Sequence, residues 1–135
     1  LDQAAEHMEY QFAAAYPDFG PIQWREEAMR SLHQREDGLW VSDYDPAIVK
    51  TVTEQADEPQ GFWPYFNSLK NIPVLALRGE LSDILNAETF AAMVKAKPDI
   101  LQVTVPNRGH TPDLSEPVSI EAIDKFLEAH GNSEI

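Results

Sequence analysis

Apolar residues are spaced in two different ways along the chain, and the change falls near residue 70. Before it, apolar residues recur every three or four positions, as on a helix that is buried along one face. After it, short unbroken apolar runs alternate with helical spacing, which is typical of buried strands separated by helices. The pattern therefore predicts a helical region over residues 1–70 and a strand–helix–strand–helix region over residues 71–135.

The helical region begins with two predicted helices. The apolar face of the first consists of Leu1, Ala5, Met8, Phe12 and Ala15. The second helix is predicted over Ile22 to His33, after a connection with two prolines that a helix does not cross. A turn is predicted over Arg35 to Gly38.

Asp45 and Pro46 predict the start of a third helix, because aspartate is a common N-cap and proline suits the first helical turn. This helix is predicted to run through Glu54. A short aromatic stretch, Gly61 to Phe66, closes the region. The sequence thus predicts helices joined by loops up to residue 66.

The second region predicts two strands, each followed by a helix. Pro73 to Leu77 is an apolar run typical of a strand covered on both faces, and Ile100 to Pro106 is a short strand rich in branched residues. Asn86 predicts the N-cap of the helix between the strands, and Pro117 the first turn of the last helix. The inward face of that last helix is predicted to consist of Ile120, Ile123, Phe126 and Leu127.

A strand–helix–strand unit favours a parallel sheet with a right-handed crossover, so the predicted fold class is α/β. Two parallel strands leave unpaired backbone groups at both edges and are poorly stable by themselves. We therefore expect a partner that completes the sheet, either a missing amino-terminal half or another copy of the chain along the open sheet.

Charge is the feature of the composition that changes this picture. Ten Lys and Arg residues against 23 Asp and Glu residues give a formal net charge of −13, spread along the chain. Such a surface repels phosphate backbones and anionic lipids, so neither nucleic acid nor a membrane is expected as a partner. The chain has no cysteine, no apolar run that could span a bilayer and no leader-like start, and we expect a cytoplasmic protein.

The two predicted strands end in loops that carry an acid and a base. Asp83 follows the first strand, and His110 follows the second behind a glycine. Ligands of open α/β sheets gather at the carboxyl ends of the strands, and an aspartate that orients a proton-accepting histidine forms two parts of a catalytic triad. Each residue alone is more often structural, since Asp in such a turn bonds its own backbone and Gly-His is a common turn. Their combination and order favour catalysis.

The segments PVLALRGELSDIL and VTVPNRGHTPDLSEPVSIEAIDKFL resemble the carboxyl-terminal half of α/β-hydrolases. The resemblance implies that Asp83, rather than Glu80, is the triad acid and that His110 is the base, in the family's order of nucleophile, acid and histidine. It implies a partial α/β-hydrolase fold, with a helical cap (lid) region over residues 1–70 followed by a β-α-β-α unit over 71–135 that contributes two parallel strands to the core.

The nucleophile motif of that family, G-x-S-x-G, is absent from the chain. The chain alone is therefore expected to be inactive. Because it also begins without Met and inside a predicted helix, we expect a fragment of a hydrolase of roughly twice this length. The expected reaction of the whole is cleavage of an ester, a lactone or a similar bond in a small-molecule substrate. A non-catalytic binding or interaction module is the alternative.

Trp24, Trp40 and Trp63 are candidates for an apolar substrate pocket under the cap. Aromatic residues of this kind are more often part of the core, and that role is the one we favour. No set of residues has the spacing of a metal site, so neither a metal nor a cofactor is expected.

Overall fold

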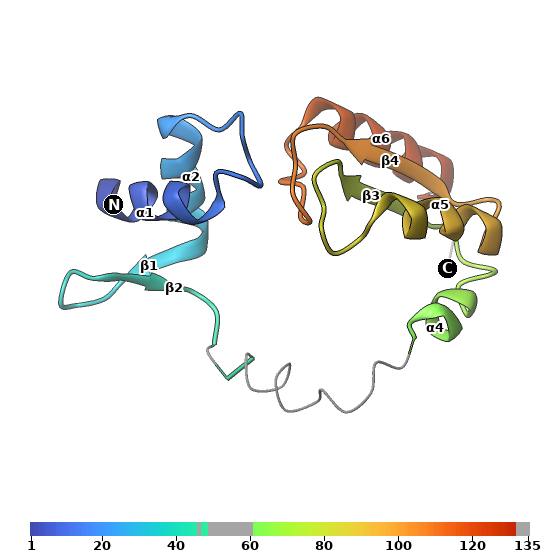
Figure 1. Cartoon of the computed structure of the whole chain (residues 1–135), viewed down its shortest axis with the longest axis horizontal. Helices are drawn as coiled ribbons and strands as arrows, with labels where there is room; N and C mark the ends of the chain where they lie inside the picture. The colour runs from blue at the N-terminus through green and yellow to red at the C-terminus, as the bar shows by residue number, and fades with distance from the viewer. Residues whose placement is uncertain (46, 49–60, 132–135) are drawn as a thin grey trace. The chain divides into compact units, whose positions relative to one another are not determined.

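The computed structural model describes residues 1–45, 47–48 and 61–131, which fall into two compact units (Figure 1). Unit 1 comprises Leu1–Ala13 and Asp18–Gly61, and unit 2 comprises Ala14–Pro17 and Phe62–Ile135. None of the helices in the described ranges is long and apolar enough to cross a bilayer.

Two helices, α1 (Asp2–Phe12) and α2 (Pro21–Ser31), pack against each other in unit 1. Their buried side chains are Ala5, Met8, Trp24 and Ala28. The predicted apolar face of the first helix is thus correct at its centre, but Phe12, at the end of α1, is 45% exposed. The core of unit 1 is small, because the buried side chains of α1 and half of those of α2 are no larger than methionine.

A β-hairpin follows α2, and the prediction of helices joined by loops is wrong here. The second helix ends at Ser31 instead of His33, and β1 (Leu32–Gln34) pairs antiparallel with β2 (Trp40–Ser42). Gly38 explains the difference, since its φ of +84° closes a tight turn between the strands. The predicted turn over residues 35–38 is confirmed by the Gly38 N–H, which donates to the Arg35 carbonyl at 2.9 Å.

The predicted third helix, from Asp45 through Glu54, lies largely outside the described residues. Its first contact is present, because Asp45 Oδ1 accepts a hydrogen bond from the Ala47 N–H at 2.8 Å. The aromatic stretch that follows forms a short helix, α4 (Trp63–Asn67), in unit 2.

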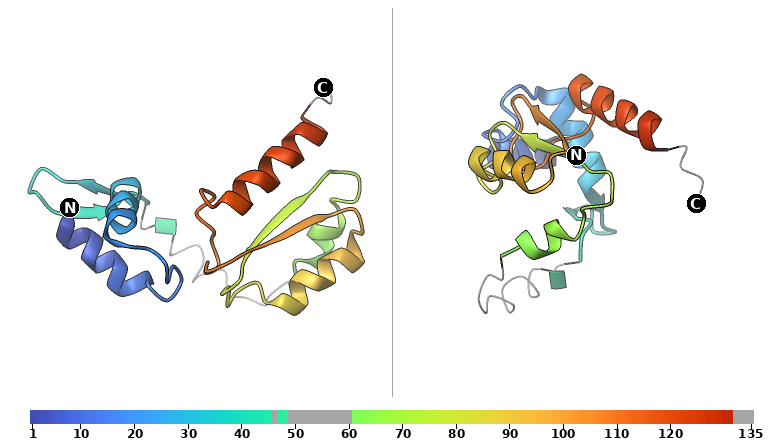
Figure 2. Two further views of the ribbon diagram at one scale, coloured as in Figure 1. Left: turned by 90° about the horizontal axis from the view of Figure 1, so that it is seen from above. Right: turned by 90° about the vertical axis from the view of Figure 1, so that its right-hand side faces the viewer.

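The parallel pair of strands predicted for the second region is confirmed. The elements of unit 2 beyond α4 are β3 (Leu75–Gly79), α5 (Ala87–Ala96), β4 (Leu101–Val105) and α6 (Pro117–His130). β3 and β4 pair in parallel from Leu75 opposite Leu101 to Gly79 opposite Val105. The helices α5 and α6 lie on opposite faces of this sheet (Figure 2).

Both helix starts in this unit follow the sequence signals. Asn86 caps α5, because its Oδ1 accepts a hydrogen bond from the Thr89 N–H at 2.7 Å. Pro117 is the first residue of α6, where its missing N–H leaves no helical hydrogen bond unmade. Local side-chain chemistry therefore sets where these helices begin.

The faces of the sheet are less covered than predicted. Leu75, Ala76 and Leu77 are only half-buried, so β3 is not enclosed on both faces within the described chain. The predicted inward face of α6 is also wrong at two positions, since Ile120 and Leu127 are 46% and 56% exposed. A two-stranded sheet offers too little surface to bury every apolar residue of the strands and helices around it.

The backbones at the ends of the two strands approach each other closely at Gly79. A Cβ built on this residue would lie 1.7 Å from the Gly109 carbonyl oxygen and 2.5 Å from that of Arg108. Only glycine permits this approach, which brings the loop after β3 against the loop after β4.

We expect Gly79→Ala to destabilise unit 2 by several kcal/mol, on the order of an overpacked core position, because rigid backbone has to move. Urea unfolding of the 135-residue chain measures the loss. Gly61→Ala is the control, since a Cβ at Gly61 would meet nothing within 4 Å. Equal stability of the two variants would contradict the close approach.

Candidate active site

The loop after β3 is held from inside by a buried arginine. Arg78 Nε donates to the Leu85 carbonyl at 2.6 Å, and a terminal nitrogen donates to the Ser82 carbonyl at 3.3 Å. The side chain is only 8% exposed. An arginine at the end of an apolar strand thus satisfies the carbonyls of the loop that follows, which makes the loop compact.

Backbone hydrogen bonds then join this loop to the loop after β4. The Glu80 N–H donates to the Val105 carbonyl at 2.9 Å, and the Leu81 N–H donates to the Arg108 carbonyl at 2.8 Å. The parallel register brings the two strand ends to the same edge of the sheet, so both loops begin side by side.

The two loops meet in a hydrogen bond between Ser82 and His110. Ser82 Oγ lies 3.1 Å from His110 Nδ1 and also accepts the Leu85 N–H at 3.1 Å. Ser82 is buried, whereas His110 is exposed. When Nδ1 carries the ring proton, it donates a hydrogen bond to Ser82 Oγ. The other ring nitrogen, Nε2, can then accept a proton from a reacting group.

The predicted acid, Asp83, adjoins this hydrogen bond in the sequence. Its carboxylate is exposed and makes no side-chain hydrogen bond or ion pair with any residue in the described ranges. Glu80, the other carboxylate of the loop, accepts the Asn107 N–H at 3.2 Å through Oε2. The structure therefore brings His110 to the predicted loop and gives its Nδ1 a hydroxyl partner, and the role of Asp83 as triad acid stays a prediction.

A buried ion pair underlies the histidine loop. Arg108 Nε donates to Glu116 Oε1 at 2.6 Å, and both residues are 8% exposed. The pKa of the Glu116 carboxyl is lowered: burial favours the neutral form and would raise it, but hydrogen bonds from Ser119, from the backbone and from Arg108 outweigh burial. Glu116 is therefore an anion at neutral pH.

Sequence reasoning missed these supporting residues. Ser82 stands next to the predicted acid in the sequence, while Arg108 and Glu116 are eight positions apart. Two features of the sequence could have indicated buried polar supports. Arg78 is a charged residue at the end of an apolar strand, and Glu116 immediately precedes Pro117 in the first turn of a helix.

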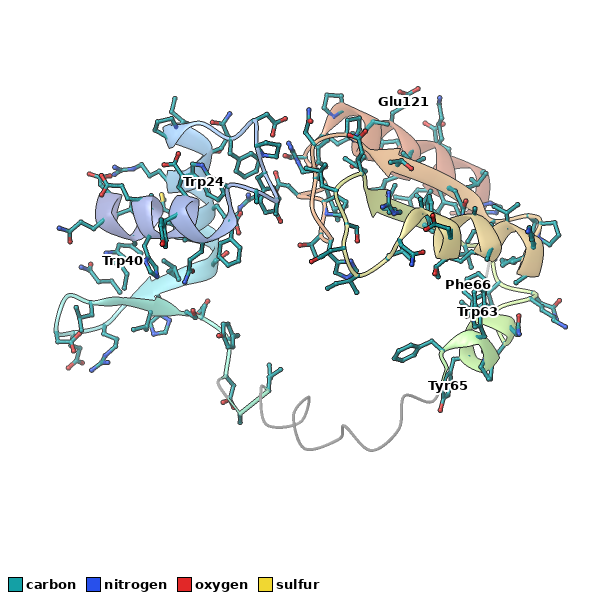
Figure 3. All side chains as sticks on the ribbon, in the orientation of Figure 1. Trp24, Trp40, Trp63, Tyr65, Phe66 and Glu121 are labelled. Carbon is teal, nitrogen blue, oxygen red and sulfur yellow. The ribbon has the colours of Figure 1, made fainter. Side chains whose placement is uncertain are left out.

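The three tryptophans occupy different places (Figure 3). Trp24 is 2% exposed in the core of unit 1 and packs edge-on against Phe19, with ring centroids 5.1 Å apart. Trp40 is half-buried on β2. Trp63, on α4, is 40% exposed and lies edge-on to Phe66 at 5.7 Å. A substrate-binding role stays a prediction for all three.

Comparison with known proteins reveals hydrolases. No family model matches the chain. The 3-hydroxybutyrate-oligomer hydrolase of Cupriavidus necator is 33% identical over 85% of this chain and 42% of its own length. The crystal structure of an alpha/beta hydrolase from Novosphingobium aromaticivorans is 39% identical, with a TM-score of 0.84 over 94% of this chain and 45% of that one.

A more distant solved structure supports the same fold. E-2-(acetamidomethylene)succinate hydrolase, 23% identical, has a TM-score of 0.68 over 92% of this chain and 45% of its own. The chain thus spans less than half the length of each protein that it matches here.

The Ser82–His110 hydrogen bond is open to a direct test. We expect Ser82→Ala to lower the free energy of unfolding by about 1 kcal/mol, since the Leu85 N–H loses its acceptor. The nitrogen NMR signals of the His110 ring should change at the same time, because Nδ1 loses its partner.

Ser68→Ala is the matched control, because Ser68 Oγ donates to the Tyr65 carbonyl at 2.6 Å on an exposed turn away from His110. Its His110 ring signals should equal those of the parent chain. Unchanged ring signals in Ser82→Ala would mean that the hydroxyl does not hold the imidazole.

Proposed function

We propose that this chain, which belongs to the α/β-hydrolase superfamily and matches a carboxyl-terminal portion of its members, supplies the base and the acid of a hydrolase for esters, lactones or similar bonds. His110 is the proposed general base, and Asp83 the proposed acid. The nucleophile would come from a part of the protein beyond these 135 residues, since the chain contains no G-x-S-x-G motif.

The observation that carries the proposal is the hydrogen bond between Ser82 Oγ and His110 Nδ1 at 3.1 Å. In the tautomer in which Nδ1 carries the proton and donates this hydrogen bond to Ser82 Oγ, Nε2 of the exposed imidazole can take the proton of a hydroxyl nucleophile as its oxygen attacks the carbonyl carbon. The same nitrogen then returns the proton to the alcohol oxygen as the ester C–O bond breaks. A water molecule repeats the two steps to release the acid.

Asp83 has a role that Ser82 cannot fill. A neutral hydroxyl orients the imidazole but does not balance the positive charge that the ring gains with the second proton. A carboxylate near Nδ1 does so and favours the imidazolium. Asp83 adjoins Ser82 in the same loop, and its exposed carboxylate is not engaged by other described side chains. We propose that Asp83 approaches Nδ1 in the assembled enzyme.

The choice of substrate rests on the relative from Cupriavidus necator, whose name specifies 3-hydroxybutyrate oligomers. Such oligomers join one hydroxy acid to the next through ester bonds, so the proposed chemistry applies to them directly. Short hydroxy-acid esters are the first substrates to test, and a simple chromogenic ester is the comparison. In this proposal Trp63, in the same unit as His110, is the candidate for contact with the apolar part of the substrate.

Exposed aromatic residues favour the second candidate, a non-catalytic interaction module. Phe62 and Tyr65, next to and on α4, are 83% and 64% exposed. Aromatic side chains are enriched at protein interfaces, where they are buried by a partner. This candidate requires no chemistry from His110, so the following experiment separates the two functions.

In the complete enzyme that contains this chain, we expect His110→Ala to lower kcat for a hydroxy-acid ester by roughly 10³-fold or more, because the general base is lost. Asp83→Asn should lower kcat strongly while leaving the fold intact, since the amide keeps the shape and removes the charge. Initial rates with purified variants measure both effects.

His130→Ala is the control, because His130 lies at the end of α6 and contacts only the ring of Phe126, at 4.9 Å, among the interactions described. Its turnover should equal that of the parent enzyme. Near-normal turnover of His110→Ala would remove the assignment of the base and favour the interaction module.

We also propose that a further strand or a second copy of the chain pairs with the open sheet. The sheet of unit 2 consists of β3 and β4 in the described chain, and Leu101, on β4, is 47% exposed. Unpaired strand edges beside exposed apolar side chains promote association.

We expect the isolated 135-residue chain to self-associate, with a mass that rises with concentration in sedimentation equilibrium. Leu101→Lys should weaken association, because a charge then lies on the sheet. Ile22→Lys, at a position 72% exposed in unit 1, is the control. A monomer at every concentration, with cooperative unfolding, would argue against a sheet that needs completion.

A further inference from the structure

We propose that the Arg108–Glu116 ion pair is a positioning device, which holds the loop over residues 107–116 in the conformation that places His110 against Ser82. The catalytic meaning of this inference rests on the proposed function. Its structural part, that Glu116 determines how the His110 ring lies against Ser82, is independent of the proposed function.

The Glu116 carboxylate collects donors from three places. Oε1 accepts Arg108 Nε at 2.6 Å and the Asp113 N–H at 2.9 Å, and Oε2 accepts Ser119 Oγ at 2.8 Å. Arg108 and Asp113 lie near the two ends of the loop, and Ser119 is in the first turn of α6. One buried carboxylate therefore ties both parts of the loop to the helix that follows.

Arg108 also restrains the residues beside His110, through its contacts with Tyr16 and Asn107. The Arg108 guanidinium lies over the Tyr16 ring, 5.9 Å from its centroid, and donates to the Asn107 carbonyl at 2.7 Å. The Tyr16 hydroxyl donates to the Thr111 carbonyl at 2.8 Å. Thr111 follows His110 directly, so its backbone position is set by a ring that the arginine covers.

The residue on the other side of His110 is held by the same segment of unit 2. The Gly109 N–H donates to the Ala15 carbonyl at 2.7 Å. A Cβ on Gly109 would lie 2.6 Å from the Ala15 side chain, so glycine is required at this contact. The histidine thus lies between two hydrogen bonds to residues 14–17, one from the Gly109 N–H to the Ala15 carbonyl and one from the Tyr16 hydroxyl to the Thr111 carbonyl.

Backbone strain indicates that the loop conformation is imposed by these contacts. Asn107 and Leu114 have φ of 54° and 66°, in the left-handed region. Asparagine tolerates this region, but for leucine it is unfavourable, because its Cβ crowds the following carbonyl oxygen. Leu114 is 49% exposed, so packing does not offset the cost, and its neighbour Asp113 is held by Glu116.

Net stabilisation is a poor explanation of the ion pair. The cost of desolvating two charges offsets most of their attraction, and an apolar pair of equal volume is often as stable. A charged, hydrogen-bonded pair does define directions that an apolar pair leaves open. Here the hydrogen bonds of the pair fix the conformation of the loop that carries His110.

The test compares Glu116→Gln with Glu121→Gln in the 135-residue chain. Glu121 is also on α6 and pairs with Lys125 at 2.5 Å, but both side chains are exposed and Glu121 lies on the outer side of the helix (Figure 3). The readout is the nitrogen NMR spectrum of the imidazole rings, in which His7, His33 and His130 are internal references.

We expect Glu116→Gln to change the His110 ring signals in the same direction as Ser82→Ala, and Glu121→Gln to leave them unchanged. Tyr16→Phe, which keeps the ring under Arg108 and removes the bond to Thr111, should give a smaller change in the same direction. This variant decides the question if Glu116→Gln does not fold. A folded variant with parent-like His110 signals would overturn the proposal.

In the complete enzyme, Glu116→Gln should lower kcat by roughly 10- to 100-fold with little change in KM, because a misplaced base slows chemistry rather than binding. If His110→Ala keeps its turnover while Glu116→Gln still changes the His110 ring signals, the proposed function fails and the positioning role stands. If His110→Ala is inactive and the ring signals do not respond to Glu116→Gln, only the positioning role fails.

Discussion

The close approach of the Gly79 backbone to Arg108 and Gly109 is the constraint on which the rest of unit 2 depends. A side chain at Gly79 would overlap the carbonyl oxygens of the opposite loop. Because this space is closed, the Leu81 N–H reaches the Arg108 carbonyl, and Ser82 reaches His110. The parallel register of β3 and β4 therefore brings the side chains of Ser82 and His110 into contact.

Polar contacts hold unit 2 together to an unusual degree. Its buried side chains include Arg78, Ser82, Lys97, Arg108, Glu116 and Ser119, whereas the buried apolar residues are Phe90, Ile100 and Val105. No buried side-chain nitrogen or oxygen lacks a hydrogen-bond partner among the residues described. Directional bonds of this kind specify loop conformation, while most of the apolar surface of the strands is only half-buried.

Local signals in the sequence sufficed for much of this fold. The parallel strands, the Asn86 cap and the start of α6 at Pro117 follow from apolar runs and capping residues. The turn at Gly38 was predicted, but the strands of the hairpin in unit 1 were missed, because Leu32 continues the helical spacing of α2. Contacts between distant residues, such as Ser82 with His110, depend on how the strands are aligned, which no local pattern records.

The contacts that hold His110 also bear on how the proposed catalytic base is oriented. The hydrogen bonds that fix its ring and its two neighbours come from Ser82, Ala15 and Tyr16, all in unit 2. None of them requires a nucleophile. The proposed base is therefore already oriented in the chain by itself, and a preoriented group needs little rearrangement in the transition state. What the hydroxyl of Ser82 cannot provide is negative charge, so the proposed hydrolysis depends on whether Asp83 brings its carboxylate to Nδ1.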